Sequence, residues 1–206
     1  MFGLFFIFLA GLSITGYRYQ NTELATHGQP AQTYGTYIGS GEFIEAVFEN
    51  WESEFLQMGA LVVGTIFLRQ RGSADSKKLR GKAEVDTSSR YSIIHSRNLR
   101  HKGRALAHHA YSHSLGLSLF ALFAVSFTLH AVGGTSASNS EALLHNQPQE
   151  SVVQYVSSAQ FWFESFQNWQ SEFLAVGTLL VLSIFLRERG SPESKPIGAP
   201  TAKTGE

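Results

Sequence analysis

The sequence predicts an all-α membrane protein with four transmembrane helices, arranged as two tandem helical hairpins that enter the membrane the same way round. Three observations support this fold class. The second half of the chain repeats the first, long apolar stretches recur in each half, and the basic residues are confined to a few segments. An internal repeat constrains the architecture strongly, because each copy should fold in the same way.

The repeat has a constant offset. The stretch FENWESEFL around Trp51 returns as FQNWQSEFL around Trp169, which gives an offset of 169 − 51 = 118 residues. The copies His27–Lys77 and His145–Lys195 align without a gap, and about half of their positions are identical. Both copies hold two apolar segments, so we expect a parallel internal repeat related by an axis along the membrane normal.

Four apolar segments are the candidate spans, namely Phe2–Ile14, Phe55–Leu68, Ser114–Val132 and Phe173–Leu186. A helix needs about 20 residues to cross a bilayer, and only the third segment is that long by itself. The repeat equates the first segment with the third. We therefore expect a span there too. Met1 aligns with Leu119, so the first residues of this span have no counterpart, and we expect a truncated amino terminus. A signal peptide is not expected, because the segment has no basic leader.

The second and fourth segments are short, but each follows an amphipathic stretch. Phe43, Val47, Phe48 and Phe55 recur at helical spacing, which predicts one continuous helix from about Gly41 to Arg69. The second copy shows the same pattern. We expect these extensions to lie in the membrane interface before the helix crosses, with the indole rings of Trp51 and Trp169 as interfacial anchors.

The charge pattern predicts the orientation. Of 16 Lys and Arg residues, 11 lie from Arg69 to Arg104 and four lie from Arg187 onward, which leaves only Arg18 elsewhere. The positive-inside rule then places both termini and the central linker in the cytoplasm. The predicted domains are a first membrane repeat (1–72), a basic cytoplasmic linker (73–110), a second membrane repeat (111–190) and a disordered cytoplasmic tail (191–206).

The linker offers contacts to lipid. Near a cytoplasmic leaflet each basic residue is attracted to anionic headgroups by about 1 kcal/mol. No nucleic-acid-binding module accompanies the basic residues, so nucleic acid is not an expected partner. His109 and His113 have a spacing that can hold a metal, but no nearby acid or cysteine completes a site, and we predict no metal or cofactor. The expected headgroup contacts are Arg97, Arg100, Lys102 and Arg104.

Polar side chains recur on one face of the predicted helices. Spacings of four and eleven residues align three positions in each copy, so each half presents a polar stripe that starts at the outer interface. A carboxylate at the membrane edge is costly unless it is paired or hydrated. The stripes are Asn50, Glu54 and Thr65 in the first copy and Asn168, Glu172 and Ser183 in the second. The alternative is that Glu54 and Glu172 only mark the outer helix ends.

His130 is the one histidine inside a predicted span. It lies at about the expected depth of Glu172, and the first copy has Leu12 in its place. We therefore predict an intramembrane pair between His130 and Glu172, present in one half only. The outer-loop sequences HGQP and HNQP are interpreted as turns, because proline fixes the backbone there.

The blocks FxNWxSEFL and FLRxRGSxxSK, each present twice, resemble an uncharacterised bacterial family of integral membrane proteins, catalogued as a domain of unknown function. The resemblance covers both repeats but not the linker and tail. It implies a bacterial inner-membrane location and four spans, and it implies no activity.

The sequence thus favours a non-enzymatic integral membrane protein of unknown biochemical activity, with a structural or envelope-associated role. The alternative is a small proton or cation permeation unit that uses Glu54 and Glu172. A third interpretation, a membrane enzyme using His130 and Glu172, has the least support, because no catalytic motif accompanies these residues. The lipid bilayer is the expected partner, and self-association and any transported substrate are left open.

Overall fold

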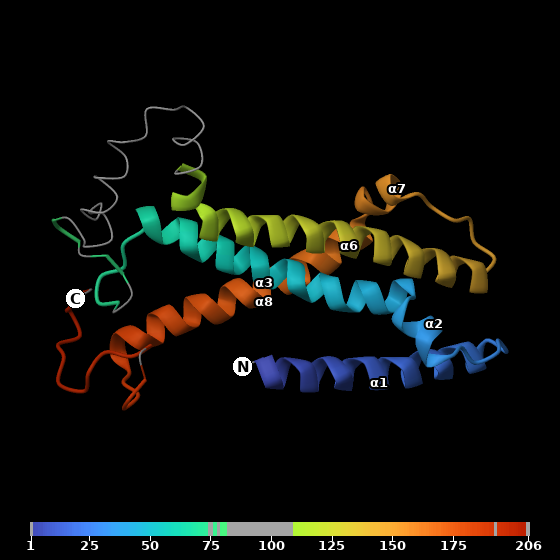
Figure 1. Cartoon of the computed structure of the whole chain (residues 1–206), viewed down its shortest axis with the longest axis horizontal. Coiled ribbons are helices and arrows are strands. Elements are labelled where there is room, and N and C mark those ends of the chain that lie inside the picture. The colour runs from blue at the N-terminus through green and yellow to red at the C-terminus, as the bar shows by residue number, and fades with distance from the viewer. Residues whose placement is uncertain (1, 74–75, 78, 82–108, 192, 205–206) are drawn as a thin grey trace. The chain divides into compact units, whose positions relative to one another are not determined.

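The computed structural model describes residues 2–73, 76–77, 79–81, 109–191 and 193–204. Every regular element within these ranges is a helix, which confirms the all-α prediction. The helices are labelled in Figure 1, and they are α1 (Phe2–Thr26), α2 (Tyr34–Ile38), α3 (Gly41–Phe67), α6 (Ser114–Leu144), α7 (Val152–Val156) and α8 (Ala159–Phe185).

The predicted continuous helix from about Gly41 to Arg69 is confirmed as α3. The helix bounds also follow the offset seen in the sequence. Helices α2 and α7 begin at residues 34 and 152, and α3 and α8 begin at 41 and 159, so both pairs differ by 118 residues (152 − 34 and 159 − 41). The same local signals therefore start and stop helices in both halves of the chain.

Two of the described helices are long and apolar enough to cross a membrane. They are α1, with a mean hydropathy of 1.3 over its most apolar stretch, and α6, with 2.0. Both are mostly exposed along these stretches, so their apolar side chains are not buried within the chain itself. The structure thus gives two candidate spans where the sequence predicts four.

The chain divides into two compact units. Unit 1 contains residues 1–54 and 122–168, and unit 2 contains residues 55–121 and 169–206. The division cuts across α3, α6 and α8. The predicted domains, which follow the two sequence repeats, stay a prediction. Spatial contact joins the start of α3 to the end of α6, which are far apart in sequence.

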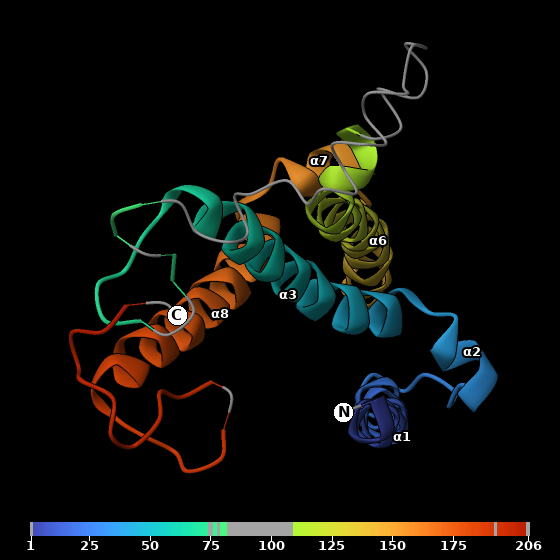
Figure 2. The same ribbon diagram turned by 60° about the vertical axis from the view of Figure 1, so that its left-hand side comes forward.

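In unit 1, α3 and the second half of α6 run antiparallel and side by side (Figures 1 and 2). Glycines allow the close approach: a Cβ added to Gly41 would lie 2.6 Å from the backbone nitrogen of Ala137, and one added to Gly133 would lie 2.8 Å from that of Glu45. Small residues commonly permit such contacts between helices. The backbone of α3 consequently presses directly against α6 near His130.

Helix α8 packs against the same region of unit 1 through aromatic residues. The buried core consists of Ala131, Tyr155 and Phe161, with Phe127 and Val156 against it. The ring of Phe161 lies edge-on to Phe127, with centroids 5.2 Å apart. An added Cβ on Gly134 would lie 2.4 Å from the Tyr155 hydroxyl, so the absence of a side chain there makes room for that ring.

The loops that precede α2 and α7 are held by the same hydrogen bonds. The Asn21 side chain donates to Gln32 O and accepts from Gln32 N, and the Asn139 side chain does the same with Glu150. Thr33 and Ser151 are the N-caps of α2 and α7. Such caps satisfy backbone N–H groups that the helix leaves unpaired, which explains why both short helices begin where they do.

In unit 2, the repeated block FLRxRGSxxSK forms a helix-terminating turn. Gly72 and Gly190 both have φ +84°, a left-handed backbone that favours glycine. The hydroxyls of Ser76 and Ser194 accept hydrogen bonds from the backbone nitrogens of residues 70 and 188, at 2.9 and 2.8 Å. The motif that carries the family resemblance thus has a structural role, since it ends α3 and α8.

Candidate functional site

The most polar buried region of unit 1 is a group that we call the His130 cluster. It brings together side chains from four helices: α3, α6, α7 and α8. Its members are linked by hydrogen bonds or by distances below 5 Å between their polar atoms. They are Glu45, Glu49, Glu52, His130, Tyr155, Glu164 and Asn168.

The three glutamates of α3 lie on one face of the helix because of their spacing. Glu49 and Glu52 follow Glu45 by four and seven residues, and positions i, i+4 and i+7 line one side of an α-helix. The close contact at Gly133 presses this side against α6. The helix packing therefore forces the carboxylates toward His130.

His130 is fully buried and held from two sides. Its Nδ1 lies 2.9 Å from Oε2 of Glu52, whose side chain is also fully buried. Because a carboxylate only accepts hydrogen bonds, Nδ1 carries the proton and donates it. The Phe161 ring stacks on the imidazole, with centroids 4.9 Å apart. These contacts fix the ring plane and direct the second nitrogen away from Glu52.

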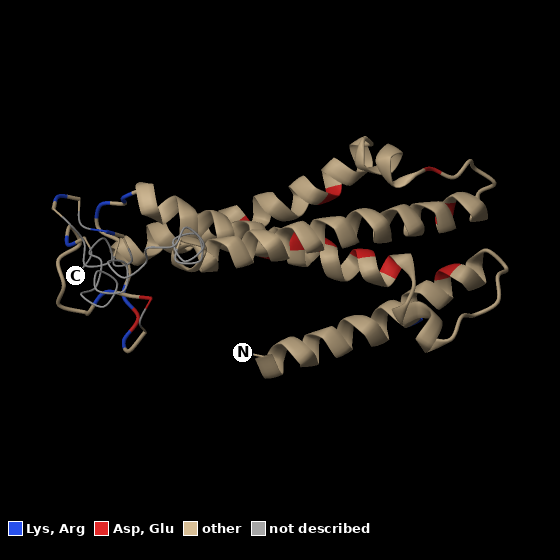
Figure 3. Cartoon of the chain, turned by 45° about the horizontal axis from the view of Figure 1, so that its top comes forward, with Lys and Arg blue, Asp and Glu red and all other residues tan. Residues whose placement is uncertain are grey.

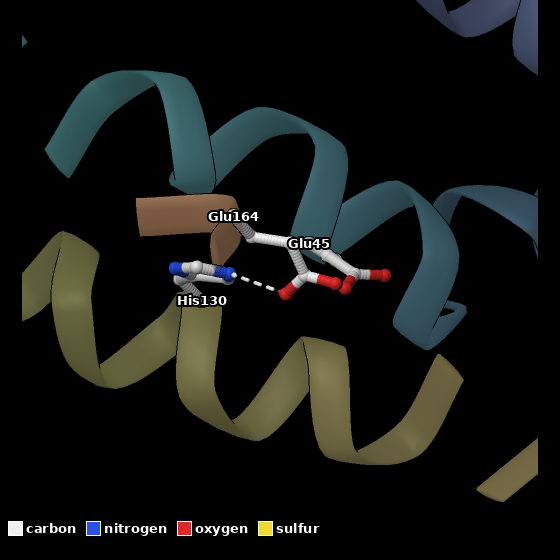
Figure 4. A group of neighbouring side chains, drawn as sticks. All are labelled: Glu45, His130 and Glu164. Carbon is white, nitrogen blue, oxygen red and sulfur yellow. Dashed lines mark ion pairs between the residues drawn. The ribbon is translucent and has the colours of Figure 1, made fainter. Parts of the chain in front are cut away.

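That second nitrogen, Nε2, faces Glu164. It lies 3.6 Å from Oε2 of Glu164, as the dashed line in Figure 4 marks. This distance exceeds that of a direct hydrogen bond, and Nε2 is a buried polar atom with no hydrogen-bond partner. Buried polar nitrogens are rarely left in this state, so the gap between His130 and Glu164 is a place for a further group.

Tyr155 connects the two remaining carboxylates. Its hydroxyl lies 2.6 Å from Oε2 of Glu164 and 3.1 Å from Oε1 of Glu45. One phenolic proton serves the shorter bond, to Glu164. Burial, together with the negative charge of Glu164, raises the pKa of the Glu45 carboxyl to about 7. A protonated Glu45 can then donate to the Tyr155 oxygen, which satisfies both contacts.

Two amides complete the surroundings of the carboxylates. The Gln160 side chain donates to Oε1 of Glu164 at 3.0 Å, and the Asn168 side chain donates to Oε1 of Glu49 at 2.5 Å. The second oxygen of Glu164, Oε2, faces Tyr155 and His130. Glu45, His130 and Glu164 each offer one ligand atom, and these atoms lie within 4.8 Å of one another (Figure 4).

A polar pocket of about 570 Å³ adjoins the cluster within unit 1. Glu45 and Gln160 line it, so the pocket reaches the residues that contact Glu164. His27 and His145 also line it, and their rings touch each other at a centroid distance of 5.3 Å. The acidic residues of its wall are Glu23, Glu42, Glu45 and Glu141, and none of its lining residues is Lys or Arg.

Unit 1 as a whole is strongly acidic. It contains nine glutamates and one basic residue, Arg18, which gives a formal charge of 1 − 9 = −8. Figure 3 shows acidic residues and no basic ones along α3, α6 and α8. A cleft lined by one sign of charge raises the local concentration of the opposite ion. The pocket and the cluster thus favour cations.

The predicted polar stripe has a mixed outcome in the first copy. Asn50 and Glu54 are exposed, and the Asn50 amide donates to Ala46 O in its own helix. The Thr65 hydroxyl donates to Leu61 O, also within α3. None of these three residues belongs to the His130 cluster.

In the second copy, Asn168 joins the cluster through Glu49, whereas the Ser183 hydroxyl donates to Leu180 O in its own helix. The predicted pair of His130 with Glu172 stays a prediction. His130 donates a hydrogen bond to Glu52 and faces Glu164, two residues that the sequence analysis did not single out.

The other predicted contacts concern lipid. The Trp51 ring lies 5.9 Å from Phe5 and 5.1 Å from Phe48 between centroids, and the interfacial role of Trp51 and Trp169 stays a prediction. The four basic residues expected at headgroups, Arg97, Arg100, Lys102 and Arg104, lie outside the described residues.

Sequence reasoning missed Glu45, Glu49, Glu52 and Glu164 because it searched for residues shared by the two copies. At the offset of 118 these positions correspond to Phe163, Gln167, Gln170 and Ala46, and His130 corresponds to Leu12. The informative signal was the difference between the copies: acids on one face of the first amphipathic helix, and a histidine in the span of the second copy.

Comparison with known proteins gives one match. The model of a family described as a domain of unknown function, DUF6766, matches residues 1–206. The chain belongs to the DUF6766 family. Neither the curated proteins nor the solved structures give a significant match. This match confirms the prediction that the chain is a domain of unknown function. A role for this DUF6766 protein must therefore be argued from the His130 cluster.

Proposed function

We propose that this DUF6766 chain is a non-enzymatic, multi-pass protein of the bacterial inner membrane that binds small cations at the His130 cluster and forms a permeation or transport unit for them. One observation carries the proposal. A fully buried histidine is surrounded by carboxylates from two helices, beside an acidic pocket. Ionisable residues inside membrane proteins commonly mark ion pathways.

Four membrane crossings are part of the proposal. The lengths and hydropathies of α1 and α6 support two of them. The second halves of α3 and α8 supply the others, because the helix bounds and the sequence identities share one offset, which supports two tandem hairpins. A helix pairs its backbone N–H and C=O groups with one another, so it can cross lipid, where no water is available to bond them.

The proposed topology has both termini and the basic linker in the cytoplasm. The support is the distribution of charge: unit 1 holds one basic residue, and the other 15 of 16 follow α3, precede α6 or follow α8 in the sequence. The positive-inside rule then puts the acidic pocket on the outer side. Cations would reach the cluster from there.

The chemistry of the cluster favours a binding role over catalysis. The pocket and the cluster offer carboxylates, amides and imidazoles, which are acceptors or ligands for a cation. No serine, lysine or cysteine nucleophile belongs to the cluster as defined by the described residues. The site therefore supports cation exchange rather than covalent chemistry.

A structural, envelope-associated role is the second candidate. It is favoured by the way in which the cluster joins α3, α6, α7 and α8 through hydrogen bonds between residues far apart in sequence. Buried polar networks can specify a unique packing. In that case the same residues would hold the helices together and would not move ions.

Ion flux into proteoliposomes distinguishes the two roles. The double variant Glu45→Gln/Glu164→Gln removes two cluster charges, and Glu54→Gln/Glu172→Gln is the matched control with the charges of the predicted stripe removed. We expect cation flux from the wild type and from the control, and at least a tenfold loss in the cluster variant. Absence of flux from the folded wild type would instead support the structural role, and loss only in the control would move the path to the stripe.

A further inference from the structure

We infer that the His130 cluster is a binding site for one divalent transition-metal cation of the Zn²⁺ type, with His130 Nε2, Glu45 and Glu164 as ligands and Glu52 as the residue that orients the histidine. This inference rests on the proposed cation role and narrows it to a cation class. It assigns a metal site that neither the family description nor the sequence analysis contains.

The unpartnered nitrogen of His130 is the first argument. His130 is fully buried, its Nδ1 proton goes to Glu52, and its Nε2 has no hydrogen-bond partner. Nε2 faces Oε2 of Glu164 at 3.6 Å, which is too long for a direct hydrogen bond. A metal ion between the two atoms would bind both of them at once.

The distances fit a small metal ion. Zinc binds imidazole nitrogen and carboxylate oxygen at about 2.0–2.2 Å, and a tetrahedral site then has ligand atoms about 3.3 Å apart. The separation of 3.6 Å between His130 and Glu164 is close to this value. The group including Glu45 lies within 4.8 Å, which requires a closure of at most about 1.5 Å.

Glu52 supplies a feature typical of metal-bound histidines. Such histidines usually donate their other ring N–H to a carboxylate, which fixes the tautomer and raises the basicity of the ligand nitrogen. The 2.9 Å contact between His130 Nδ1 and Glu52 has this geometry, and both side chains are fully buried. Tyr155 similarly holds Oε2 of Glu164 at 2.6 Å.

The number of carboxyl groups also favours a cation. The cluster contains four of them, on Glu45, Glu49, Glu52 and Glu164, around one imidazole. Buried carboxylates are costly when nothing compensates their charge, so a bound cation lowers this cost.

The mixture of ligands selects the class of metal. Imidazole nitrogen is a ligand for zinc, cobalt and similar ions, whereas magnesium and calcium prefer oxygen alone. Three protein ligands leave one position for water, and the polar pocket beside Glu45 supplies a route to it. Glu45 thus contacts both the site and the pocket through which an ion would arrive.

Cobalt substitution tests the site directly. Full-length protein, purified in detergent and stripped with chelator, would be titrated with Co²⁺ while the visible d–d absorption is recorded, and then with Zn²⁺. We expect one Co²⁺ per chain, with an intense four- or five-coordinate spectrum that Zn²⁺ abolishes. His130→Ala and Glu164→Gln should weaken binding by at least about 100-fold, and Glu52→Gln by about 10- to 100-fold.

The matched control uses histidines outside both the cluster and the pocket. His109→Ala/His113→Ala removes a pair whose rings are 4.7 Å apart. This variant should keep the cobalt spectrum. Loss of the signal in this control with retention in His130→Ala would overturn the assignment. Failure of the monodisperse wild type to bind stoichiometric Co²⁺ would overturn it regardless of how the variants fold.

The binding titration and the flux assay can fail separately. Metal binding without flux would leave the site intact and contradict the transport role. Flux that depends on Glu45 and Glu164 without binding of Co²⁺ or Zn²⁺ would support the transport role and overturn the metal site, with monovalent cations or protons as the occupants.

Discussion

Glu52 accepts a hydrogen bond from Nδ1 of His130 at 2.9 Å, and neither side chain is accessible to solvent. The two residues are separated by 78 positions and lie on α3 and α6. The contact therefore links the two sequence repeats. Neither residue is repeated: the second copy has Gln170 in place of Glu52, and the first copy has Leu12 in place of His130. Several consequences can be measured.

Replacing Glu52 with alanine should destabilise the fold. Removing one partner of a buried ion pair costs about 3–5 kcal/mol, because the other group is left without compensation. The free energy of unfolding in mixed micelles measures the loss. Glu54→Ala is the matched control, since Glu54 lies two residues away and is exposed, and it should change stability by less than about 0.5 kcal/mol. Equal effects of the two changes would contradict the burial of the pair.

The contact between α3 and α6 predicts a strong effect of Gly133→Ala. The added Cβ would lie 2.8 Å from the backbone nitrogen of Glu45 and 2.8 Å from Cγ2 of Ile44. Overpacking of this kind costs about 1–3 kcal/mol. Gly11→Ala is the control, because a Cβ there meets nothing within 4 Å, and it should be neutral or stabilising. Thermal unfolding of both variants in one detergent gives the comparison.

Tyr155→Phe should weaken the fold while keeping the aromatic core. The ring is fully buried, and the hydroxyl contacts Glu164 and Glu45. A hydrogen bond to a charged group contributes about 1.5–3 kcal/mol. We expect a loss of this size in the free energy of unfolding. Tyr111→Phe, at a residue that is 81% exposed, should have no measurable effect. A neutral Tyr155→Phe would show that the carboxylates do not depend on the hydroxyl.

The proposed topology can be tested with single cysteines, because the natural chain contains none. Gln29→Cys and Gln149→Cys lie in the loops expected outside, and Ser96→Cys lies in the basic linker. In intact spheroplasts, a membrane-impermeant maleimide should label the first two and leave the third unlabelled until the cells are lysed. Labelling of Ser96→Cys in intact cells would reverse the orientation.

Much of the fold could be predicted from the sequence. The apolar spacing of Phe43, Val47 and Phe55 predicted a helix from about Gly41 to Arg69, and the structure has α3 over Gly41–Phe67. Local periodicity determines such an element, so one sequence is enough. The repeat offset then gave the corresponding helix in the second half, which begins at Ala159.

The candidate site could be predicted only in part. His130 was identified from its position within an apolar segment, but its partner was assigned to Glu172 by expected depth. Which helix faces contact one another depends on packing at Gly41 and Gly133, and glycine carries no periodic signal. Glu52 lies in a repeated motif, two residues before Glu54. The second copy has Gln170 in its place, and this difference between the copies was the informative signal.

The central claim is that the His130 cluster holds a cation. The zinc K-edge X-ray absorption spectrum of the full chain in lipid nanodiscs tests this claim most directly. We expect a first shell of nitrogen and oxygen at about 2.0–2.2 Å, with the multiple-scattering features of one imidazole that disappear in His130→Ala. A spectrum that matches hydrated zinc, or that is unchanged in His130→Ala, would contradict the account.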